Sequence, residues 1–459
     1  MLAVKILLGL VGLGVVVFVH ELGHFIAARL VGIDVEAFSI GWGKPMLAKK
    51  IGTVEYRLGV FPIGGYCKMR GENEFSAAWE SGRNKTKPDT GSFFGAPPAA
   101  RILVAFAGPL FNLLFAMLVF TVIWGIGFEY TTMGNRIVLV SDVFPGESYP
   151  AARAGLKTGD RILEIDGKPV ENYRDIQGII AVNAEKKLDF KVQRENAQEN
   201  GQPQILNFEI SPELEKSSGA GRIGVYFWAD PVIGSVTPGS PAAAAGLESG
   251  DRIVRVNGEP FLYSVDMFKV LDGGTRPQTL SIEAERDGKT VGTELAVPQD
   301  ADTPLGITWQ AATYRTPRYS LFGAIGRGFG EMRETLAVSI RSLALLFRGV
   351  DLTKAVSGPV RVTYMTGEVA ADSFSQSTGT GLRSTGNFLA LISIALAVMN
   401  LLPLPVLDGG LILLSLIEIA RRRPLHPRFI SAYQTAGIAL IGAIMLFALF
   451  GDILFFMKG

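Results

Sequence analysis

The sequence predicts a polytopic α-helical membrane protein into which two copies of a small α+β domain are inserted. Three observations lead to this fold class. The mean hydropathy is +0.29 and charged residues make up 19% of the chain, below the roughly 25% of soluble domains. Four long, mainly apolar stretches run through the chain, and one segment recurs 91 residues later. The formal net charge of +1 argues against nucleic acid as a partner.

Each of the four apolar stretches is long enough to cross a bilayer as a helix, because a helix that rises 1.5 Å per residue needs about 20 residues for the crossing. The stretches are residues 6–28, 102–128, 384–407 and 429–451. The first follows Lys5 and could instead be a removable signal peptide. No small-residue cleavage pattern follows it, so we expect a membrane span. Four spans place both termini on the same side.

The orientation follows from the loop between the third and fourth spans, which is short and strongly basic over residues 421–428. Short loops rich in Lys and Arg stay in the cytoplasm. The loop after the first span shares that side and is also rich in Lys and Arg. We therefore expect the large stretch 130–380 to lie outside the cytoplasm.

The recurring segment has the pattern of a duplicated domain, because a period near 90 residues is too long for a solenoid. Ala-Gly-Leu is expected to end a short helix, residues 161–165 alternate as a strand, and Asp166-Gly167 forms a hairpin turn. Four residues of the first copy recur in order in the second: Gly155, Gly159, Asp160 and Gly167 become Gly246, Gly250, Asp251 and Gly258.

After the repeats, residues 319–350 alternate between apolar and charged side chains with helical spacing. The pattern predicts an amphipathic helix that lies on the membrane surface or against other helices. An ordinary helix packed on a domain is nearly as well supported. The apolar face consists of Leu336, Ile340, Leu343 and Phe347.

The chemistry is concentrated in the first span, which contains His20, Glu21 and His24. Residues i and i+4 share a helix face, so both imidazoles can reach one ion, while Glu21 lies beside the ion and can take a proton from water. This is the HExxH arrangement of zinc metalloproteases. Titratable residues in a membrane span are functional by default. The alternative is a polar cluster that only holds helices together.

A catalytic zinc ion needs a third protein ligand, and Asp408 is the better of two candidates. It follows a stretch with Pro403 and Pro405 and precedes a Gly pair, which cannot continue a regular helix. A broken helix at membrane depth is tolerated where it lines a cavity or packs in protein. The other candidate, His426, sits between prolines in the basic loop. Two further carboxylates near span ends, Glu418 and Asp452, are expected to be ordinary interfacial charges.

Three groups of motifs together resemble the site-2 protease family of intramembrane metalloproteases. They are HELGH over 20–24, NLLPLPVLDGG over 400–410, and the two repeats, which resemble circularly permuted bacterial PDZ domains. Shorter matches are FPIGGY with Lys68-Met69, Ala107-Gly108-Pro109 with Asn112, and Ser357-Gly358-Pro359. One departure is Cys67, where an aliphatic residue is expected. The resemblance covers nearly the whole chain.

The resemblance implies a Zn²⁺ ion held by His20, His24 and Asp408, with Glu21 as the general base. It implies hydrolysis of a peptide bond in the transmembrane segment of single-span proteins of the anti-sigma-factor type, after a first cut by another protease. Remnant signal peptides are a further possible substrate class. The expected location is a bacterial inner membrane, with the PDZ domains in the periplasm and the basic loops in the cytoplasm.

The same resemblance suggests how a substrate is held. Residues 41–70 resemble the family's membrane-associated β-hairpin, whose edge can pair with an extended peptide. Asn400 could bind the substrate backbone, or it could only cap the helix at the break. Ligand binding and size filtering are equally open for the PDZ domains. The tentative substrate-binding residues are Asn400, Pro403, Asn112, Gly64 and Gly65.

These observations divide the chain into eight parts. They are a first transmembrane helix (1–31), a hairpin and loop (32–98), a second transmembrane helix (99–128), two PDZ domains (129–218 and 219–310), an amphipathic helical linker (311–380), a broken third transmembrane helix (381–420), and a basic loop with the fourth (421–459). The polar stretch 72–92 has no assigned role. Two competing functions are a membrane metal transporter and a PDZ scaffold with a vestigial site.

Overall fold

A computed structural model describes residues 2–71, 90–144, 146, 148–195, 203–215, 219–272, 276–300, 303–345 and 358–458. Most of the unassigned stretch 72–92 therefore lies outside the described residues. The chain forms two compact units. One comprises 1–128 and 317–459, called here the helical unit, and the other comprises 129–316, called here the β unit.

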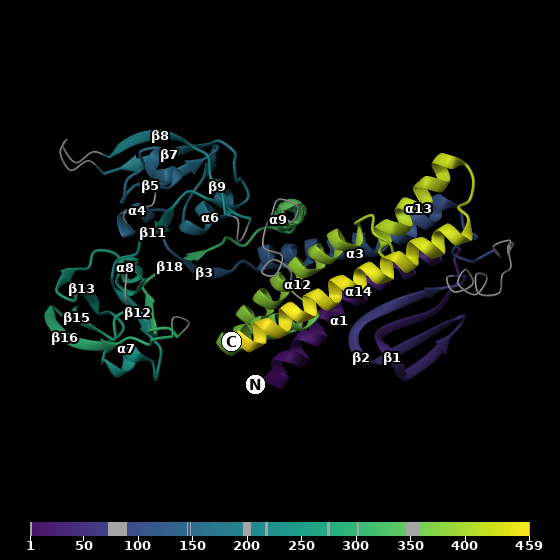
Figure 1. The fold of residues 1–459 in the computed structure, drawn as a ribbon, viewed down its shortest axis with the longest axis horizontal. Helices are drawn as coiled ribbons and strands as arrows, with labels where there is room; N and C mark the ends of the chain where they lie inside the picture. Colours follow the sequence, from purple (N-terminus) through teal and green to yellow (C-terminus); the bar gives the residue numbers. More distant parts are fainter. Residues whose placement is uncertain are drawn as a thin grey trace. The chain divides into compact units, whose positions relative to one another are not determined.

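The helical unit contains four helices that are long and apolar enough to cross a membrane, which confirms the predicted spans for the described residues. They lie within α1 (Leu2–Leu30), α3 (Pro98–Ile126), α12 (Thr378–Asn400) and α14 (Pro427–Lys458). Figure 1 shows these helices as long ribbons, with α13 (Asp408–Arg421) following α12 after a break. The two prolines account for the interruption at residues 401–407, whereas the glycine pair, which the sequence also led us to expect in the break, lies in the first turn of α13.

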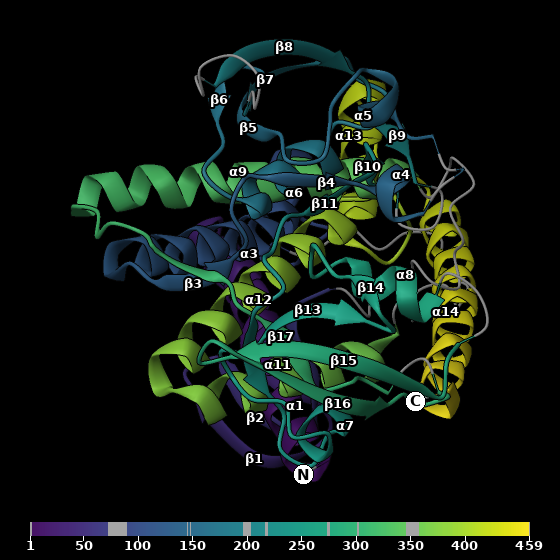
Figure 2. The same cartoon turned by 90° about the vertical axis from the view of Figure 1, so that its left-hand side faces the viewer.

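Glycines bring the N-terminal helix into very close contact with its neighbour α11 (Pro359–Gln376). A Cβ atom on Gly9 would collide with the carbonyl of Thr363, and one on Gly367 would collide with the carbonyl of Lys5. Small residues at such crossings let helix backbones approach each other. The predicted linker 311–380 thus includes a helix that packs inside the bundle; Figure 2 shows α11 beside α1.

The predicted amphipathic helix is α9 (Leu321–Leu345), and it packs along α3 and α12. Leu336 contacts a buried cluster that includes Phe120 and Ile394, while Ile340 is exposed. Glu331 accepts a hydrogen bond from the indole of Trp124. Of the alternatives considered, the structure therefore supports a helix that lies against other helices. Predicted face residue Phe347 lies outside the described residues.

The predicted hairpin is present as two long antiparallel strands, β1 (Val35–Ile51) and β2 (Val54–Met69). The strands pair with several register irregularities near the helices. Cys67 is buried in a cluster with Phe38, Met69 and Val104, so it packs as a small apolar side chain. This packing fixes one end of the hairpin against α1 and α3.

Two carboxylates that the sequence suggested were ordinary interfacial charges are buried and fully engaged. Glu418 pairs with Arg101 of α3 and accepts a hydrogen bond from the backbone of Leu425. Asp452 accepts three backbone hydrogen bonds at the start of α11, from Gly358 and the two residues after Pro359. The prediction was wrong for both, because sequence position cannot reveal partners on distant helices.

The β unit consists of two domains whose four-stranded sheets have the same strand order. The first contains a four-stranded antiparallel sheet in the order β6-β5-β7-β8, and the second a sheet in the order β14-β13-β15-β16. The strands are β5 (Arg161–Ile165), β6 (Lys168–Pro169), β7 (Leu188–Arg194), β8 (Gln204–Ile210), β13 (Arg252–Val256), β14 (Glu259–Pro260), β15 (Thr279–Arg286) and β16 (Lys289–Ala296). Asp166-Gly167 and Asn257-Gly258 all have positive φ, as the predicted turns require.

Short helices and strands complete each domain. The helices are α4 (Val140–Val143), α5 (Pro150–Arg153) and α6 (Tyr173–Ala181) in the first domain, and α7 (Pro241–Ala244) and α8 (Asp266–Asp272) in the second. The strand pairs are β4 (Ile137–Leu139) with β11 (Val225–Phe227), β9 (Glu213–Leu214) with β10 (Gly221–Arg222), and β12 (Ile233–Val236) with β17 (Ile307–Trp309).

The first and last strands of the β unit, β3 (Glu129–Thr132) and β18 (Ala312–Arg315), pair with each other. This pairing explains how the whole unit can be inserted into a membrane protein, because its two ends leave side by side. A cluster of Val138, Val143 and Val265, flanked by Trp228 and Tyr263, joins the two domains. The β unit is therefore one packed body with its own interdomain core.

Candidate metal centre

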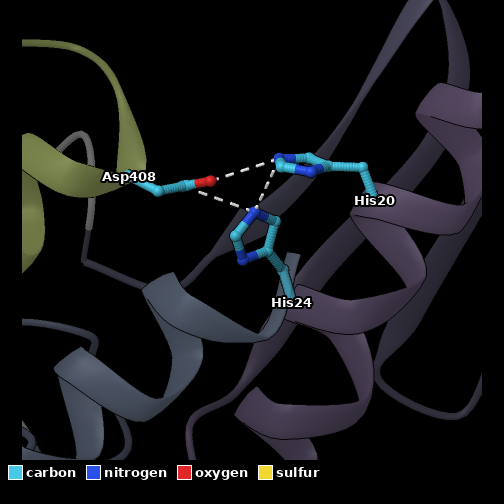
Figure 3. Close-up of side chains that lie close together, drawn as sticks. All are labelled: His20, His24 and Asp408. Carbon is cyan, nitrogen blue, oxygen red and sulfur yellow. Dashed lines mark hydrogen bonds and ion pairs between the residues drawn. The ribbon is translucent and has the colours of Figure 1, made fainter. Parts of the chain in front are cut away.

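Two turns of α1 and the first residue of α13 meet in the helical unit. His20 and His24 lie one helical turn apart, and their Nε2 atoms are 3.2 Å from each other. The Asp408 carboxylate faces both rings, with Oδ2 3.2 Å from His20 Nε2 and Oδ1 3.4 Å from His24 Nε2. Figure 3 shows the three side chains converging from two helices.

These separations fit a tetrahedral zinc site. With zinc–ligand bonds of about 2.0–2.1 Å, two ligands of a tetrahedral ion lie about 3.3–3.4 Å apart. Here the two Nε2 atoms are 3.2 Å apart, and each has a different Asp408 oxygen 3.2–3.4 Å away; with one ligand atom taken per residue, all three lie within 4.8 Å of one another. Asp408 Oδ2 is buried and has no hydrogen-bond partner within the described part of the chain. A buried carboxylate oxygen without a partner is costly, and a cation would remove that cost.

In each imidazole the Nε2 atom faces Asp408, and the other ring nitrogen, Nδ1, contacts α3. We call Nδ1 the outer nitrogen. His24 Nδ1 lies 2.8 Å from the carbonyl oxygen of Val104, so Nδ1–H donates there and Nε2 is left as a lone pair for a metal. His20 Nδ1 lies 3.1 Å from the side-chain amide of Asn112. The sequence alone gave no signal for the Val104 carbonyl, because a backbone atom leaves no mark on residue identity.

Gly108 lets α3 approach the two histidines. A Cβ atom at this position would collide with His24 Nε2 and would come within 2.9 Å of His20 Cε1. The next residue, Pro109, has no N–H and so cannot donate to the carbonyl of Ala105 one turn earlier. The Ala-Gly-Pro motif therefore lets α3 come close to the site at a point where the helix lacks one backbone hydrogen bond.

Glu21 borders the same cavity, which has a volume of about 410 Å³. The backbone of Cys67 in β2 hydrogen-bonds the Glu21 carboxylate. The cavity is also lined by Tyr66, Asn400 and Val406. A carboxylate beside, but outside, the three converging donors has the position of a proton acceptor for a water molecule in the cavity.

The predicted substrate-binding residues occupy different places. Asn400 lines the cavity, with Nδ2 3.3 Å from His20 Nε2. Pro403 is exposed, and its carbonyl accepts a hydrogen bond from Tyr433 of α14. A Cβ atom on Gly65 would lie 3.3 Å from Glu21 Cγ, whereas Gly64 faces Trp42. These roles stay predictions, and Asn400 has the geometry best suited to a substrate contact.

The break between α12 and α13 presents Asp408 through a strained turn. Val406 has φ of 74°, a region that β-branched residues rarely adopt. The glycines after Asp408 are needed for packing, since a Cβ on Gly409 would meet the carbonyls of Leu401 and Leu402. His426 is exposed in the basic loop, away from the three donors, as expected.

The sequence comparisons identify the family of this chain. The profile described as "Peptidase family M50" matches residues 8–444. The chain belongs to peptidase family M50. It is 36% identical over 454 residues to "Putative zinc metalloprotease" of Treponema pallidum, covering 98% of this chain and 99% of that protein. It is 30% identical over 459 residues to "Regulator of sigma E protease" of Haemophilus influenzae, covering 97% of each chain.

A third relative, a zinc metalloprotease by name from Neisseria meningitidis, is 33% identical over 454 residues and is matched over 96% of each chain. Members of this family depend on zinc. The protein is therefore a multi-pass membrane metalloprotease, and zinc is its metal. The competing predictions of a metal transporter and of a scaffold with a vestigial site are set aside by this result.

Proposed function

We propose that the protein hydrolyses a peptide bond inside the transmembrane segment of single-span membrane proteins, with zinc held by His20, His24 and Asp408. The observation that carries this proposal is the set of three side chains whose ligand atoms lie within 4.8 Å of one another and line a cavity between apolar helices. A site enclosed by membrane helices is suited to a substrate that is itself a membrane segment.

The protein's own residues perform the steps around the scissile bond. When bound, zinc supplies Lewis acidity, which polarises a carbonyl and makes water a stronger acid. Glu21 accepts the proton of the attacking water and passes it to the nitrogen of the leaving amine. Its hydrogen bond from the Cys67 backbone keeps the carboxylate aimed into the cavity. The proton balance closes without a covalent intermediate on the protein.

The substrate must unwind to expose its scissile bond, because a helical peptide bond is shielded by its own turn. The inner end of β2 borders the cavity through Tyr66, Cys67 and Met69, so an extended substrate could pair with that strand. Asn400 would donate its amide N–H to the substrate backbone. The amide is positioned for this by its place at the C-terminal end of α12.

We further propose that the two domains of the β unit are PDZ domains that act as a size filter outside the cytoplasm. Their repeated sheets, the paired entry and exit strands, and the interdomain valine cluster support a rigid inserted body. The basic loop at Arg421, Arg422 and Arg423 supports a cytoplasmic location for the end of α13. A protein of the bacterial inner membrane with its PDZ domains in the periplasm would have the β unit outside the cytoplasm and the end of α13 inside it.

The regulator-of-sigma-E relative suggests the substrate class. We propose single-span proteins of the anti-sigma-factor type, cut first by another protease on the outer side, with release of a cytoplasmic fragment. Remnant signal peptides are a second class of the same shape, a short apolar segment without a folded outer domain. Both would pass a filter that excludes intact outer domains.

The deciding experiment uses the purified full-length protein in lipid nanodiscs with a panel of single-span substrates, with and without a chelator. We expect cleavage within the membrane segment, its loss with chelator, and its recovery with zinc. Glu21→Gln should retain zinc but lose cleavage, whereas Glu209→Gln, a matched change on an exposed strand, should behave as wild type. Wild-type cleavage by Glu21→Gln would refute the general-base role.

The filter is tested with the same intact protein. We expect substrates with a trimmed outer segment to be cleaved and the same substrates with a folded outer domain to be spared. Equal cleavage of both would contradict the size filter without affecting the assignment of the metal site.

A further inference from the structure

We infer that Asn112 is a positioning residue that accepts a hydrogen bond from His20 Nδ1–H and thereby presents the Nε2 lone pair of His20 to the metal. This inference rests on the proposed zinc site. It differs from the substrate-binding role that the sequence suggested for Asn112. The side chain has 0% of its surface exposed, so contact with a substrate would require rearrangement of α3.

The two imidazoles face the same requirement at their outer nitrogens. Zinc binds the deprotonated ring nitrogen of a neutral histidine, and the other ring nitrogen then carries a proton that needs an acceptor. For His24 the acceptor is the Val104 carbonyl, 2.8 Å from Nδ1. For His20 the Asn112 amide lies 3.1 Å from Nδ1. Both acceptors come from α3, two turns apart.

The orientation of the Asn112 amide decides which tautomer of His20 is stable. With the amide nitrogen toward the ring, Nδ1 accepts and the proton lies on Nε2, where it blocks a metal. A half-turn of the amide places Oδ1 toward the ring, where it accepts from Nδ1–H. Oδ1 has no hydrogen-bond partner among the described residues, so the half-turn gives it one, while Nδ2 exchanges its contact with Nδ1 for the position that Oδ1 leaves.

The backbone of Asn112 is held independently of its side chain. Ser393 of α12 donates its hydroxyl to the Asn112 carbonyl at 3.0 Å, and both residues are completely buried. The same helix α12 ends at Asn400, whose amide lies on the Nε2 side of His20. His20 is therefore flanked by two amides with separate roles, one on the outer nitrogen and one on the cavity side.

The test measures zinc affinity rather than proteolysis. The purified full-length protein and its variants are titrated with zinc in competition with a chromophoric chelator. Asn112→Leu removes the acceptor and should weaken zinc binding about 10- to 100-fold, the usual cost of losing such a partner. Asn112→Asp retains an acceptor oxygen and should stay within about threefold of wild type, since a carboxylate accepts the same N–H.

Two controls separate positioning from packing. Thr121→Val removes another polar group of α3, a hydroxyl that donates to the Met117 carbonyl, and should leave zinc affinity within about threefold, as should Ser393→Ala, which removes only the backbone contact. Equal losses in Ser393→Ala and Asn112→Leu would overturn the inference, as would wild-type affinity in Asn112→Leu or a loss in Asn112→Asp equal to that in Asn112→Leu.

A spectroscopic measurement keeps the inference testable if a variant fails to fold. The chain has three histidines, so ¹⁵N-histidine labelling of the zinc-loaded wild-type protein gives few ring signals to assign. We expect His20 as the Nδ1–H tautomer with its proton in a hydrogen bond; a freely exchanging Nδ1 proton would contradict the inference. Neither readout uses substrate, so a protein that binds zinc as expected but cuts nothing would refute only the proposed protease function.

Discussion

Buried aspartates in the two units illustrate the difference between a structural and a functional carboxylate. In the β unit, Asp160 and Asp251 are each 1% exposed, and each is gripped by two nitrogens of one arginine, Arg194 or Arg286, at 2.6–2.7 Å. A backbone N–H completes each set. In the helical unit, Asp408 Oδ2 is buried without a hydrogen-bond partner in the described residues.

The two aspartate–arginine pairs of the β unit show what a full set of hydrogen bonds does for a buried carboxylate. Arg194 and Arg286 also donate to the carbonyls of Gly155 and Gly246. Each arginine therefore connects its own strand to the loop that precedes the aspartate, residues 155–160 or 246–251. Such charge-assisted, bidentate pairs fix geometry. Asp408 instead faces the Nε2 atoms of two imidazoles, and a cation held between these three groups would use the carboxylate oxygens. The two aspartates of the β unit thus have their hydrogen-bonding capacity used, whereas Asp408 keeps an oxygen available for the proposed metal.

The largest effect should come from the matched pair Asp408→Asn and Asp251→Asn. Asp408→Asn should lower zinc affinity by more than about 1,000-fold, beyond the cost of losing an outer partner, because the anionic ligand is removed. Asp251→Asn should leave zinc affinity unchanged. Metal analysis and chelator competition on the purified proteins measure both. If the Asp408→Asn protein kept its full zinc content, Asp408 would not be a zinc ligand and would not differ from Asp251 in this respect.

A smaller effect is expected from moving α3 away from the imidazoles. Gly108→Ala places a Cβ atom against both rings, and a displacement of about 1 Å in a catalytic site can cost about 100-fold in rate. The control is Gly125→Ala on the same helix, where the nearest atom to a new Cβ is that of Ala324 at 3.6 Å. Proteolysis rate and zinc content should fall for the first variant alone.

The hydrogen bonds of Asp251 should raise the free energy needed to open the segment around it. Asp251→Asn should lower the opening free energy of the surrounding segment by about 1.5–3 kcal/mol, the worth of charge-assisted hydrogen bonds. Hydrogen exchange of residues 246–286 in the full-length protein measures this opening. Exchange that is unchanged in this segment would mean that the arginine pair contributes nothing to stability.

The same pair gives a pH dependence with a defined sign. The hydrogen bonds from Arg286 hold the pKa of Asp251 below its usual value of 3.8. A lowered folded-state pKa stabilises the fold above the unfolded pKa, and this contribution is lost as the pH falls through the folded-state value. The difference in exchange between wild type and Asp251→Asn should therefore be full at neutral pH and shrink below about pH 4. A difference that grows on acidification would be the contrary result.

The smallest effect should come from the strained turn that presents Asp408. Val406→Gly relieves a positive φ that costs about 1–3 kcal/mol but adds about 0.5–1 kcal/mol of chain entropy on unfolding. We expect a net stabilisation of about 1 kcal/mol together with somewhat weaker zinc binding, because the turn becomes looser. Thermal unfolding of the metal-free protein and zinc titration measure the two effects. Destabilisation of the metal-free protein would show that the valine side chain contributes more than the strain costs.

The sequence alone predicted the elements that depend on local patterns. The four spans follow from apolar length, the hairpin turns from Asp-Gly and Asn-Gly, and the break before Asp408 from two prolines. The glycine pair was wrongly expected to interrupt the helix, because it lies in the first turn of α13. The two histidines could be placed on one face because the helical period is fixed. These features are recorded within a few neighbouring residues, so they can be read before folding is known.

Contacts between helices that are far apart in the sequence could not be predicted from local patterns. Glu418 and Asp452 looked like interfacial charges until Arg101 and the start of α11 were found beside them. The contact between Asn112 and His20 was likewise not predicted from the sequence. The residues in each of these pairs are about 90 or more positions apart, and no local propensity links them.

The sequence by itself thus determined that a membrane chain contains two imidazoles one helical turn apart, a carboxylate between them and a broken helix. Only the tertiary structure decided that Asp408 meets the imidazoles, that the Val104 carbonyl and the Asn112 amide lie against their Nδ1 atoms, and that Gly108 leaves room for them. The physical reason is that metal coordination depends on distances of a few ångströms between side chains, and packing among helices sets those distances.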